Sequence, residues 1–118
     1  MIRIPDTDRI EVRLADGAAN PYLLQAALIG TGLWGVENKT APGKRMDIDM
    51  YAEGHKVRNA PKLPLNLLDA LRNFQQNKII RGILGADFTD SYHKLKMDEW
   101  NNYMQHFSEW ERLNALDV

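Results

Sequence analysis

The chain has 118 residues, with 15 lysines and arginines against 16 aspartates and glutamates and a formal net charge of −1 at pH 7. This length suggests one domain, and 44% hydrophobic with 26% charged residues is the balance of a folded rather than a disordered protein. A nearly neutral charge gives no basic field for nucleic acid or an anionic membrane, so we expect neither as a partner. The absence of cysteine excludes disulfides, thiolate zinc sites and thiol catalysis.

No segment is typical of a secretory signal or a membrane span. Residues 1–15 mix charged with apolar residues and lack the continuous apolar core of a signal peptide. The longest apolar stretch, Tyr22 to Val36, covers about fifteen residues, whereas a membrane-spanning helix needs about 20. We therefore expect a cytoplasmic protein without a membrane partner.

Two short segments at the N-terminus predict a β-hairpin. Apolar and polar residues alternate in residues 2–4 and in residues 9–14, and the segment Pro5-Asp6-Thr7-Asp8 between them is typical of a turn. The alternation places apolar residues on one face: Ile2, Ile4, Ile10, Val12 and Leu14. The other face carries the charged residues Arg3, Arg9, Glu11 and Arg13. Because alternate residues of a strand lie about 6.5–7 Å apart, these charged groups could converge on one ligand.

The charged face has two interpretations from its pattern alone. The commoner one is a solvated face whose salt bridges contribute little to stability. The other is a site for an anionic substrate, in which guanidinium groups bind phosphate or carboxylate and Glu11 holds a divalent cation. The spacing leaves both open.

Other polar residues carry weaker signals. His55 lies in a predicted loop, and His93 and His106 in a predicted helix lack a metal-ligand spacing, so we interpret all three as ordinary surface or boundary histidines. Asp47 and Asp49 are most simply a solvated pair of loop carboxylates. The aromatic residues near the C-terminus have no interleaved basic residues, which favours core packing over nucleic-acid stacking.

The segment after the hairpin predicts a helix that is apolar on almost every side. Asn20 suits an N-cap, and Pro21 suits the first helical position because its missing N–H leaves no hydrogen bond unmade there. Apolar side chains surround most of the helix from Tyr22 to Val36, which is typical of a helix buried in a larger protein. A chain of 118 residues offers too few partners to cover it, so we expect a homo-oligomer.

The rest of the chain predicts one long loop and further helices. Residues 37–63 are polar and interrupted by prolines and glycines, which favours an extended loop. Residues 64–77 and 78–84 have helical spacing, and the second helix ends at Gly85. From Asp87 onward, apolar and aromatic residues recur at threes and fours, which predicts one long amphipathic C-terminal helix. The fold class is therefore α+β and mostly helical, with an N-terminal hairpin, a buried helix, a long loop and C-terminal helices.

Several segments in fixed order carry a resemblance to a known family. Along the chain they are IRIP, RIEVRLADGAANPYLLQAALIGTGLWGVENK, PGKRMDIDMY, LPLNLLDAL and HFSEWERLNALDV. The second resembles the signature Arg-x-Glu-x-Arg, then Asn-Pro-Tyr-Leu, then Gly-Leu-x-Gly-x-x-x-Lys. Together they resemble the C-terminal segment of the catalytic domain of the glutamine synthetase family, in the branch with bacterial glutamine synthetases and γ-glutamylmethylamide synthetases. The resemblance covers essentially all of residues 1–118 and implies a piece of that family's catalytic barrel.

The resemblance implies a role for each charged residue of the predicted hairpin. Arg3 and Arg9 would contact the phosphates of ATP, and Arg9 would also take part in catalysis. Glu11 would be one ligand of a divalent cation, Mg²⁺ or Mn²⁺, that is bound together with ATP. Arg13 would bind the carboxylate of glutamate and also take part in catalysis. The implied reaction passes through γ-glutamyl phosphate, from which ammonia or an amine displaces phosphate.

The resemblance also implies that residues 1–118 are an incomplete catalytic domain. Members of the family are several times longer, with a β-rich domain and most of the barrel ahead of this segment, and their sites borrow residues from a neighbouring subunit. We expect the isolated chain to lack ligase activity and to bind neither ATP nor a metal ion tightly. The alternative is a non-catalytic assembly module that pairs with itself or with full-length synthetase subunits. Coding sequence for the barrel directly upstream of Met1 would favour the first interpretation.

Overall fold

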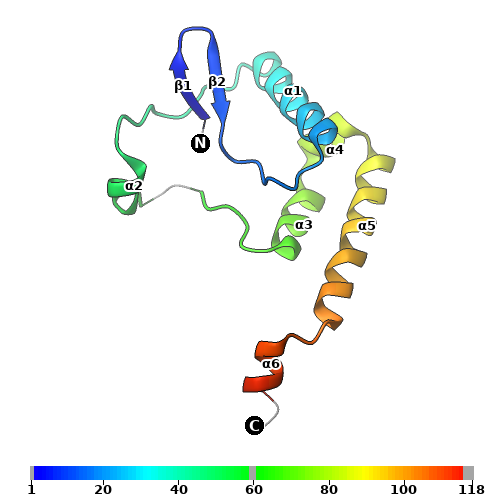
Figure 1. Cartoon of the computed structure of the whole chain (residues 1–118). Helices are drawn as coiled ribbons and strands as arrows, with labels where there is room; N and C mark the ends of the chain where they lie inside the picture. The colour runs from blue at the N-terminus through cyan, green and yellow to red at the C-terminus, as the bar shows by residue number, and fades with distance from the viewer. Residues whose placement is uncertain (1, 59–60, 116–118) are drawn as a thin grey trace. The chain divides into compact units, whose positions relative to one another are not determined.

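A computed structural model describes residues 2–58 and 61–115, and the chain divides into two compact units with the boundary after Thr40 (Figure 1). The N-terminal unit contains two strands and one helix, β1 (Ile2–Asp6), β2 (Arg9–Val12) and α1 (Pro21–Glu37). In its described residues, the C-terminal unit contains a short 3₁₀ helix and five α-helices, namely α2 (Met50–Glu53), η1 (Gly54–Lys56), α3 (Leu67–Gln76), α4 (Lys78–Leu84), α5 (Ala86–Gln105) and α6 (Glu109–Asn114). The expected fold class, mostly helical with an N-terminal antiparallel hairpin, is confirmed.

The hairpin forms where the alternation predicts it, but its turn is shorter than expected. Strand β1 pairs antiparallel with β2, and Asp6 lies opposite Arg9, so Thr7 and Asp8 alone connect the strands. The Asp6 carboxylate accepts a hydrogen bond of 2.8 Å from the backbone N–H of Thr7, which supports this tight turn. The expected four-residue turn is therefore wrong, because its first two residues continue β1.

Strand β1 also contains one residue more than the part of β2 that it faces. Three residue steps separate Arg3 from Asp6, whereas two separate their partners Glu11 and Arg9, so the register shifts between these pairs. Pro5 lies in the shifted segment, where the absence of a proline N–H removes no regular ladder bond. This β-bulge leaves the pair Arg3–Glu11 in register and displaces the turn end of the hairpin.

Helix α1 begins and ends on the polar groups that flank it. The Asn20 side chain accepts hydrogen bonds from the backbone N–H groups of Tyr22 and Leu23, at 3.0 and 3.2 Å, and Pro21 occupies the first turn, as the sequence predicts. At the other end the N–H of Thr40 donates to the carbonyl of Gly35, five residues back, at 2.9 Å. This bond closes the C-terminus of the helix in the pattern of a Schellman motif.

The residue that permits this helix ending is a lysine. Lys39 has φ of 51°, in the left-handed region that glycine usually occupies, and its N–H donates to the carbonyl of Val36 at 3.1 Å. Among the described residues it is the one non-glycine residue with positive φ. The helix therefore ends at a strained position, and no glycine in the sequence marks it.

Many of the large apolar side chains of α1 are exposed in this chain. No residue of α1 is buried, and Ile29, Leu33 and Val36 are 64%, 58% and 76% exposed. The helix forms where it was expected, but the expectation that it is buried is wrong for this chain, because the described residues offer too few partners to cover its apolar side chains.

The core of the C-terminal unit lies where α3 meets α5. Leu71 of α3 is 3% exposed, and the Phe74 ring contacts Tyr92 of α5 edge to face, with 5.7 Å between ring centroids. Tyr92 also stacks on Phe88, one turn earlier on α5, at 5.8 Å. Helix α4 packs against both α3 and α5 and closes this small helical cluster.

Two expectations for the C-terminal unit need correction. The predicted loop over residues 37–63 contains short helices, because the Asp49 carboxylate accepts a 2.9 Å hydrogen bond from the N–H of Tyr51 and caps α2; residues 59–60 lie outside the described part. The predicted single C-terminal helix is wrong. Helix α5 ends at Gln105, and α6 begins after Ser108, whose hydroxyl and backbone N–H exchange hydrogen bonds with Glu111 in a capping box.

Within residues 2–58 and 61–115, no helix is long and apolar enough to cross a membrane.

Candidate functional site

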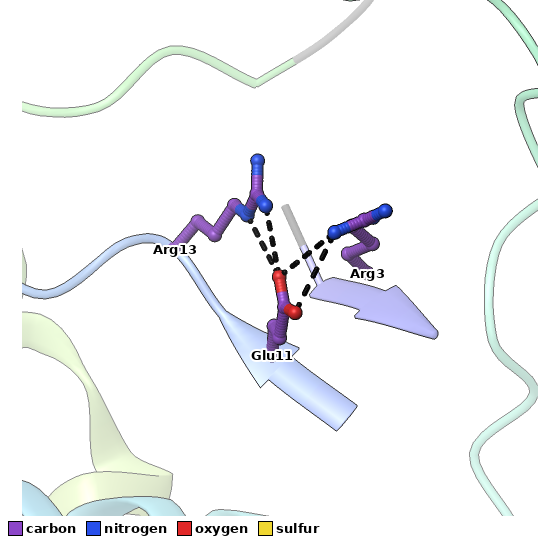
Figure 2. Close-up of polar contacts among 3 residues, drawn as sticks. All are labelled: Arg3, Glu11 and Arg13. Carbon is purple, nitrogen blue, oxygen red and sulfur yellow. Dashed lines mark hydrogen bonds and ion pairs between the residues drawn. The ribbon is translucent and has the colours of Figure 1, made fainter. Parts of the chain in front are cut away.

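Three charged residues of the hairpin meet around one carboxylate (Figure 2). Arg13 donates from Nε and Nη2 to Oε2 of Glu11, at 3.2 and 2.8 Å. Arg3 approaches the same carboxylate from the other strand, with Nη1 3.4 Å from Oε2 and 3.5 Å from Oε1. We call Arg3, Glu11 and Arg13 the hairpin charge cluster.

The strand geometry accounts for this cluster. Arg3 and Glu11 are direct cross-strand partners, so their side chains leave the hairpin on the same face at short range. Arg13 lies two residues after Glu11 and therefore points to the same side, just beyond the end of β2 at Val12. The sequence prediction that charges of opposite sign share one face is realised at these three positions.

Arg9 is placed differently from the other arginines. It begins β2 and lies opposite Asp6, beyond the β-bulge. Among the contacts of the described residues, it makes no hydrogen bond or ion pair with the hairpin charge cluster. The structure thus brings together three of the four predicted site residues and leaves Arg9 apart.

The two guanidinium groups also favour the ionised form of the carboxylate. The hydrogen bond from Arg13 lowers the pKa of Glu11, partial desolvation opposes it, and the hydrogen bond and charge of Arg3 lower it further. Glu11 is therefore ionised at neutral pH, and two positive groups surround one negative group. The side chains of Arg3 and Arg13 are 57% and 53% exposed, so solvent and salt screen the cluster.

Glu11 suits a divalent cation in donor chemistry but supplies one ligand. An ionised carboxylate is the oxygen donor that Mg²⁺ and Mn²⁺ accept. Within the described ranges, no group of three or more histidine, aspartate or glutamate side chains could hold a metal ion. A divalent cation at Glu11 would therefore need further ligands.

The remaining sequence candidates contribute to local structure. Asp47 forms an ion pair of 2.6 Å with Arg45, and Asp49 caps α2, so the two carboxylates have separate partners. His93 lies on α5 beside a shallow depression that Arg81 and Asp90 also line.

A polar contact between α4 and α5, formed around one buried hydroxyl, had no signal in the sequence. Arg81 of α4 forms an ion pair with Asp90 of α5 and also donates to the hydroxyl of Thr89 at 3.3 Å. Thr89 is 4% exposed and donates to the carbonyls of Gly85 and Ala86. These residues are eight and nine positions apart and face each other because Gly85, at φ 87°, turns the chain between the helices. Without the turn, no helical periodicity relates them.

A family model described as "Glutamine synthetase, catalytic domain" matches residues 1–115. The chain belongs to this family. A glutamine synthetase of Rhizobium leguminosarum bv. phaseoli is 54% identical over all 118 residues, which cover 27% of that protein. A glutamate–methylamine ligase of Methyloversatilis universalis is 40% identical over 125 aligned positions, covering 99% of this chain and 27% of the relative.

The fold agrees with this family assignment. A solved structure described as "Apo GmaS without ligand" superposes on the whole chain with a TM-score of 0.92 and 51% sequence identity, and the chain covers 28% of it. The chain thus spans about a quarter of the length of the relatives it matches. The resemblance to a segment of the catalytic domain, in the branch that contains glutamine synthetases and methylamine ligases, is confirmed.

Proposed function

We propose that this chain is the C-terminal part of the catalytic domain of an ATP-dependent ligase that joins glutamate to ammonia or an amine. The γ-carboxylate of glutamate attacks the terminal phosphate of ATP, which releases ADP and forms γ-glutamyl phosphate. The nitrogen of ammonia or the amine then attacks the acyl carbon and expels inorganic phosphate. Similarity to both a glutamine synthetase and a glutamate–methylamine ligase supports this reaction class and leaves ammonia and methylamine as alternative substrates.

The observation that carries the proposal is the convergence of two arginines on an ionised carboxylate within a matched segment of the family. In the proposed site Arg3 and Arg9 bind ATP phosphates, and Arg13 binds the glutamate carboxylate. Arg9 and Arg13 also stabilise charge that develops during transfer. Glu11 is one ligand of Mg²⁺ or Mn²⁺, which when bound neutralises phosphate charge. Arg9 lies apart from the others, which suits contact with a long triphosphate rather than the same anion.

We propose that the isolated chain is inactive. A micromolar nucleotide site needs about 8 kcal/mol of binding free energy, whereas an exposed ion pair contributes about 0–1 kcal/mol. A magnesium site also needs more than one carboxylate and close to octahedral geometry. The chain supplies one such carboxylate in this cluster, so residues beyond it would have to complete both sites.

The second candidate function is an assembly module that pairs with itself or with full-length synthetase subunits. The exposed apolar side chains of α1 favour it, because contact of apolar surface with water is unfavourable and a partner would remove that contact. We propose a cytoplasmic homo-oligomer in either case. The two candidates differ in whether the hairpin charge cluster takes part in a reaction.

A chimera tests the ligase proposal. In it, this chain replaces the 54% identical segment of the Rhizobium leguminosarum glutamine synthetase. We expect the chimera to release phosphate from ATP in the presence of glutamate and an amine, and the isolated chain to show only background release. Arg13→Ala should chiefly raise the KM for glutamate, and Arg9→Ala should chiefly lower kcat, each by about 10²–10³-fold in kcat/KM.

The matched control is Arg72→Gln, which removes an exposed arginine from an ion pair on α3, far along the chain from the proposed site. It should leave the kinetics of the chimera unchanged. A folded chimera without activity, or Arg9 and Arg13 variants with unaltered kinetics, would contradict the ligase proposal. Phosphate release by the isolated chain, lost in Glu11→Ala, would contradict its inactivity.

A further inference from the structure

Both oxygens of the Glu11 carboxylate already have positive partners in this structure. Arg13 places two N–H groups on Oε2, and Arg3 contacts both Oε2 and Oε1 (Figure 2). These partners come from different places, one from the opposite strand and one from two residues along the chain. Glu11 is therefore neutralised by groups of the same hairpin.

A divalent cation would have to share this carboxylate with the guanidinium groups. Mg²⁺ lies about 2.0–2.1 Å from a ligand oxygen, while Nη2 of Arg13 already lies 2.8 Å from Oε2. A cation on either oxygen would therefore approach two groups of its own sign, which disfavours binding. Because the arginine side chains are more than half exposed, they can turn away into solvent without breaking the fold.

We propose that Arg13 and Arg3 form a latch on Glu11, so that a divalent cation and the guanidinium groups compete for one carboxylate, and that an anionic substrate opens the latch by drawing Arg13 away. This inference rests on the proposed roles of Arg13 and Glu11 and adds an order to them. The two arginines do not contribute equally, because the contacts of Arg3 are longer than those of Arg13. Arg13 is the stronger part of the latch.

The latch couples two ligands that never touch the same atom. A carboxylate that binds Arg13 frees Glu11 for the cation, and a cation on Glu11 frees Arg13 for the carboxylate. By thermodynamic reciprocity each ligand then raises the affinity of the other by the same factor. Without the latch, the two would bind independently or couple only through direct contact.

The test measures Mn²⁺ at Glu11 by paramagnetic broadening of backbone amides in the ¹⁵N-labelled 118-residue chain. This readout detects weak binding and needs no enzymatic activity. We expect Arg13→Gln to increase broadening at the Glu11 amide about fivefold or more at equal Mn²⁺, with a smaller increase for Arg3→Gln. Adding glutamate should increase broadening in the unmodified chain and have no further effect in Arg13→Gln. Unshifted amides of Ile10 and Val12 confirm that each variant keeps its hairpin.

Two controls separate the latch from the underlying roles. Arg72→Gln removes a different paired arginine and should leave broadening at the hairpin unchanged. Glu11→Gln in the Arg13→Gln background should abolish the increase; if it does not, Mn²⁺ does not bind Glu11 and the proposed metal role fails. If Glu11→Gln abolishes broadening but Arg13→Gln and glutamate leave it unchanged, the metal role stands and the latch is overturned.

Discussion

Helix α1 and the cluster of α3 with α5 differ in how their apolar side chains are covered. Helix α1 is apolar around most of its circumference and has no buried residue, whereas α3 carries a single apolar stripe and buries Leu71 to 3% exposure. Apolar content alone therefore does not make a core. A narrow apolar stripe that packs against another helix buries its side chains more completely than a wide apolar surface that has no packing partner.

The largest expected effect concerns α1. We expect the chain to self-associate at low micromolar concentration, because each large apolar side chain removed from water contributes about 1.5–3 kcal/mol. The variant Ile29→Glu with Leu33→Glu places charge on two exposed positions of α1 and should shift the chain to monomer. Light scattering measures the molecular mass of the unmodified chain and of the double variant. The control is Gln25→Glu, which adds charge at a polar position of the same helix. A monodisperse 13.5 kDa species from the unmodified chain would refute the prediction.

The core of the C-terminal unit should respond to a single truncation. Leu71→Ala should destabilise this unit by about 2–5 kcal/mol, because it removes buried methyl groups and leaves a cavity. Leu65, which is 92% exposed, offers the matched control, and Leu65→Ala should change stability by less than about 0.5 kcal/mol. Denaturant unfolding followed by circular dichroism compares the two. Equal effects would mean that the packing of α3 on α5 does not hold this unit together.

Local signals in the sequence were enough to predict most elements. The Asn20–Pro21 pair places the start of α1, and the spacing of apolar residues places α4 and α3, although α3 begins three residues later than predicted. These features depend on neighbours within one turn of a helix or one strand, which a sequence displays directly. The charged side of the hairpin was predictable for the same reason, because alternation fixes which side a strand residue faces.

Features that depend on competing or distant partners could not be predicted in this way. The aromatic spacing across residues 103–110 continues a helical pattern, yet α5 ends at Gln105 and the Ser108–Glu111 capping box begins another helix. The β-bulge that separates Arg9 from the cluster depends on cross-strand register. The contact of Arg81 with Asp90 depends on the turn at Gly85. Each of these needs the geometry of two elements together.

A smaller effect is expected at the end of α1. Lys39→Gly should stabilise the last turn by about 0.5–1 kcal/mol. Glycine removes the strain of φ 51°, and the greater conformational entropy of glycine in the unfolded chain offsets part of this gain. Thr40→Gly, at the next position, has no positive φ to relieve and should destabilise instead. Amide hydrogen exchange of Asn38 and Thr40 reports the difference. If these amides exchange faster in both variants than in the unmodified chain, the left-handed conformation of Lys39 does not destabilise the last turn.

The smallest effect is a pH dependence of the α4–α5 contact, in which Asp90 accepts a 2.8 Å hydrogen bond from Nη2 of Arg81. This bond lowers the pKa of Asp90 below its ordinary value of 3.8, desolvation opposes it, and the charges of Arg81 and His93 lower the pKa further. The folded state therefore binds fewer protons than the unfolded state at acidic pH. The contribution of the pair is complete above the unfolded pKa and is lost as the pH falls through the folded one.

Thermal unfolding of the chain between pH 2 and pH 7 tests this sign. This range extends from about two pH units below the ordinary pKa of an aspartate to about three units above it. Asp90→Asn should remove part of the acid-induced loss of stability while lowering stability at neutral pH, since the amide cannot replace the charged partner of Arg81. Asp98→Asn, on the same helix, is the matched control and should not change the difference in stability between neutral and acidic pH. An Asp90→Asn variant with an unchanged pH profile would show that the Arg81–Asp90 pair makes no pH-dependent contribution to stability. In that case the buried Thr89 hydroxyl and its two carbonyl partners would be the polar contact that orders this corner.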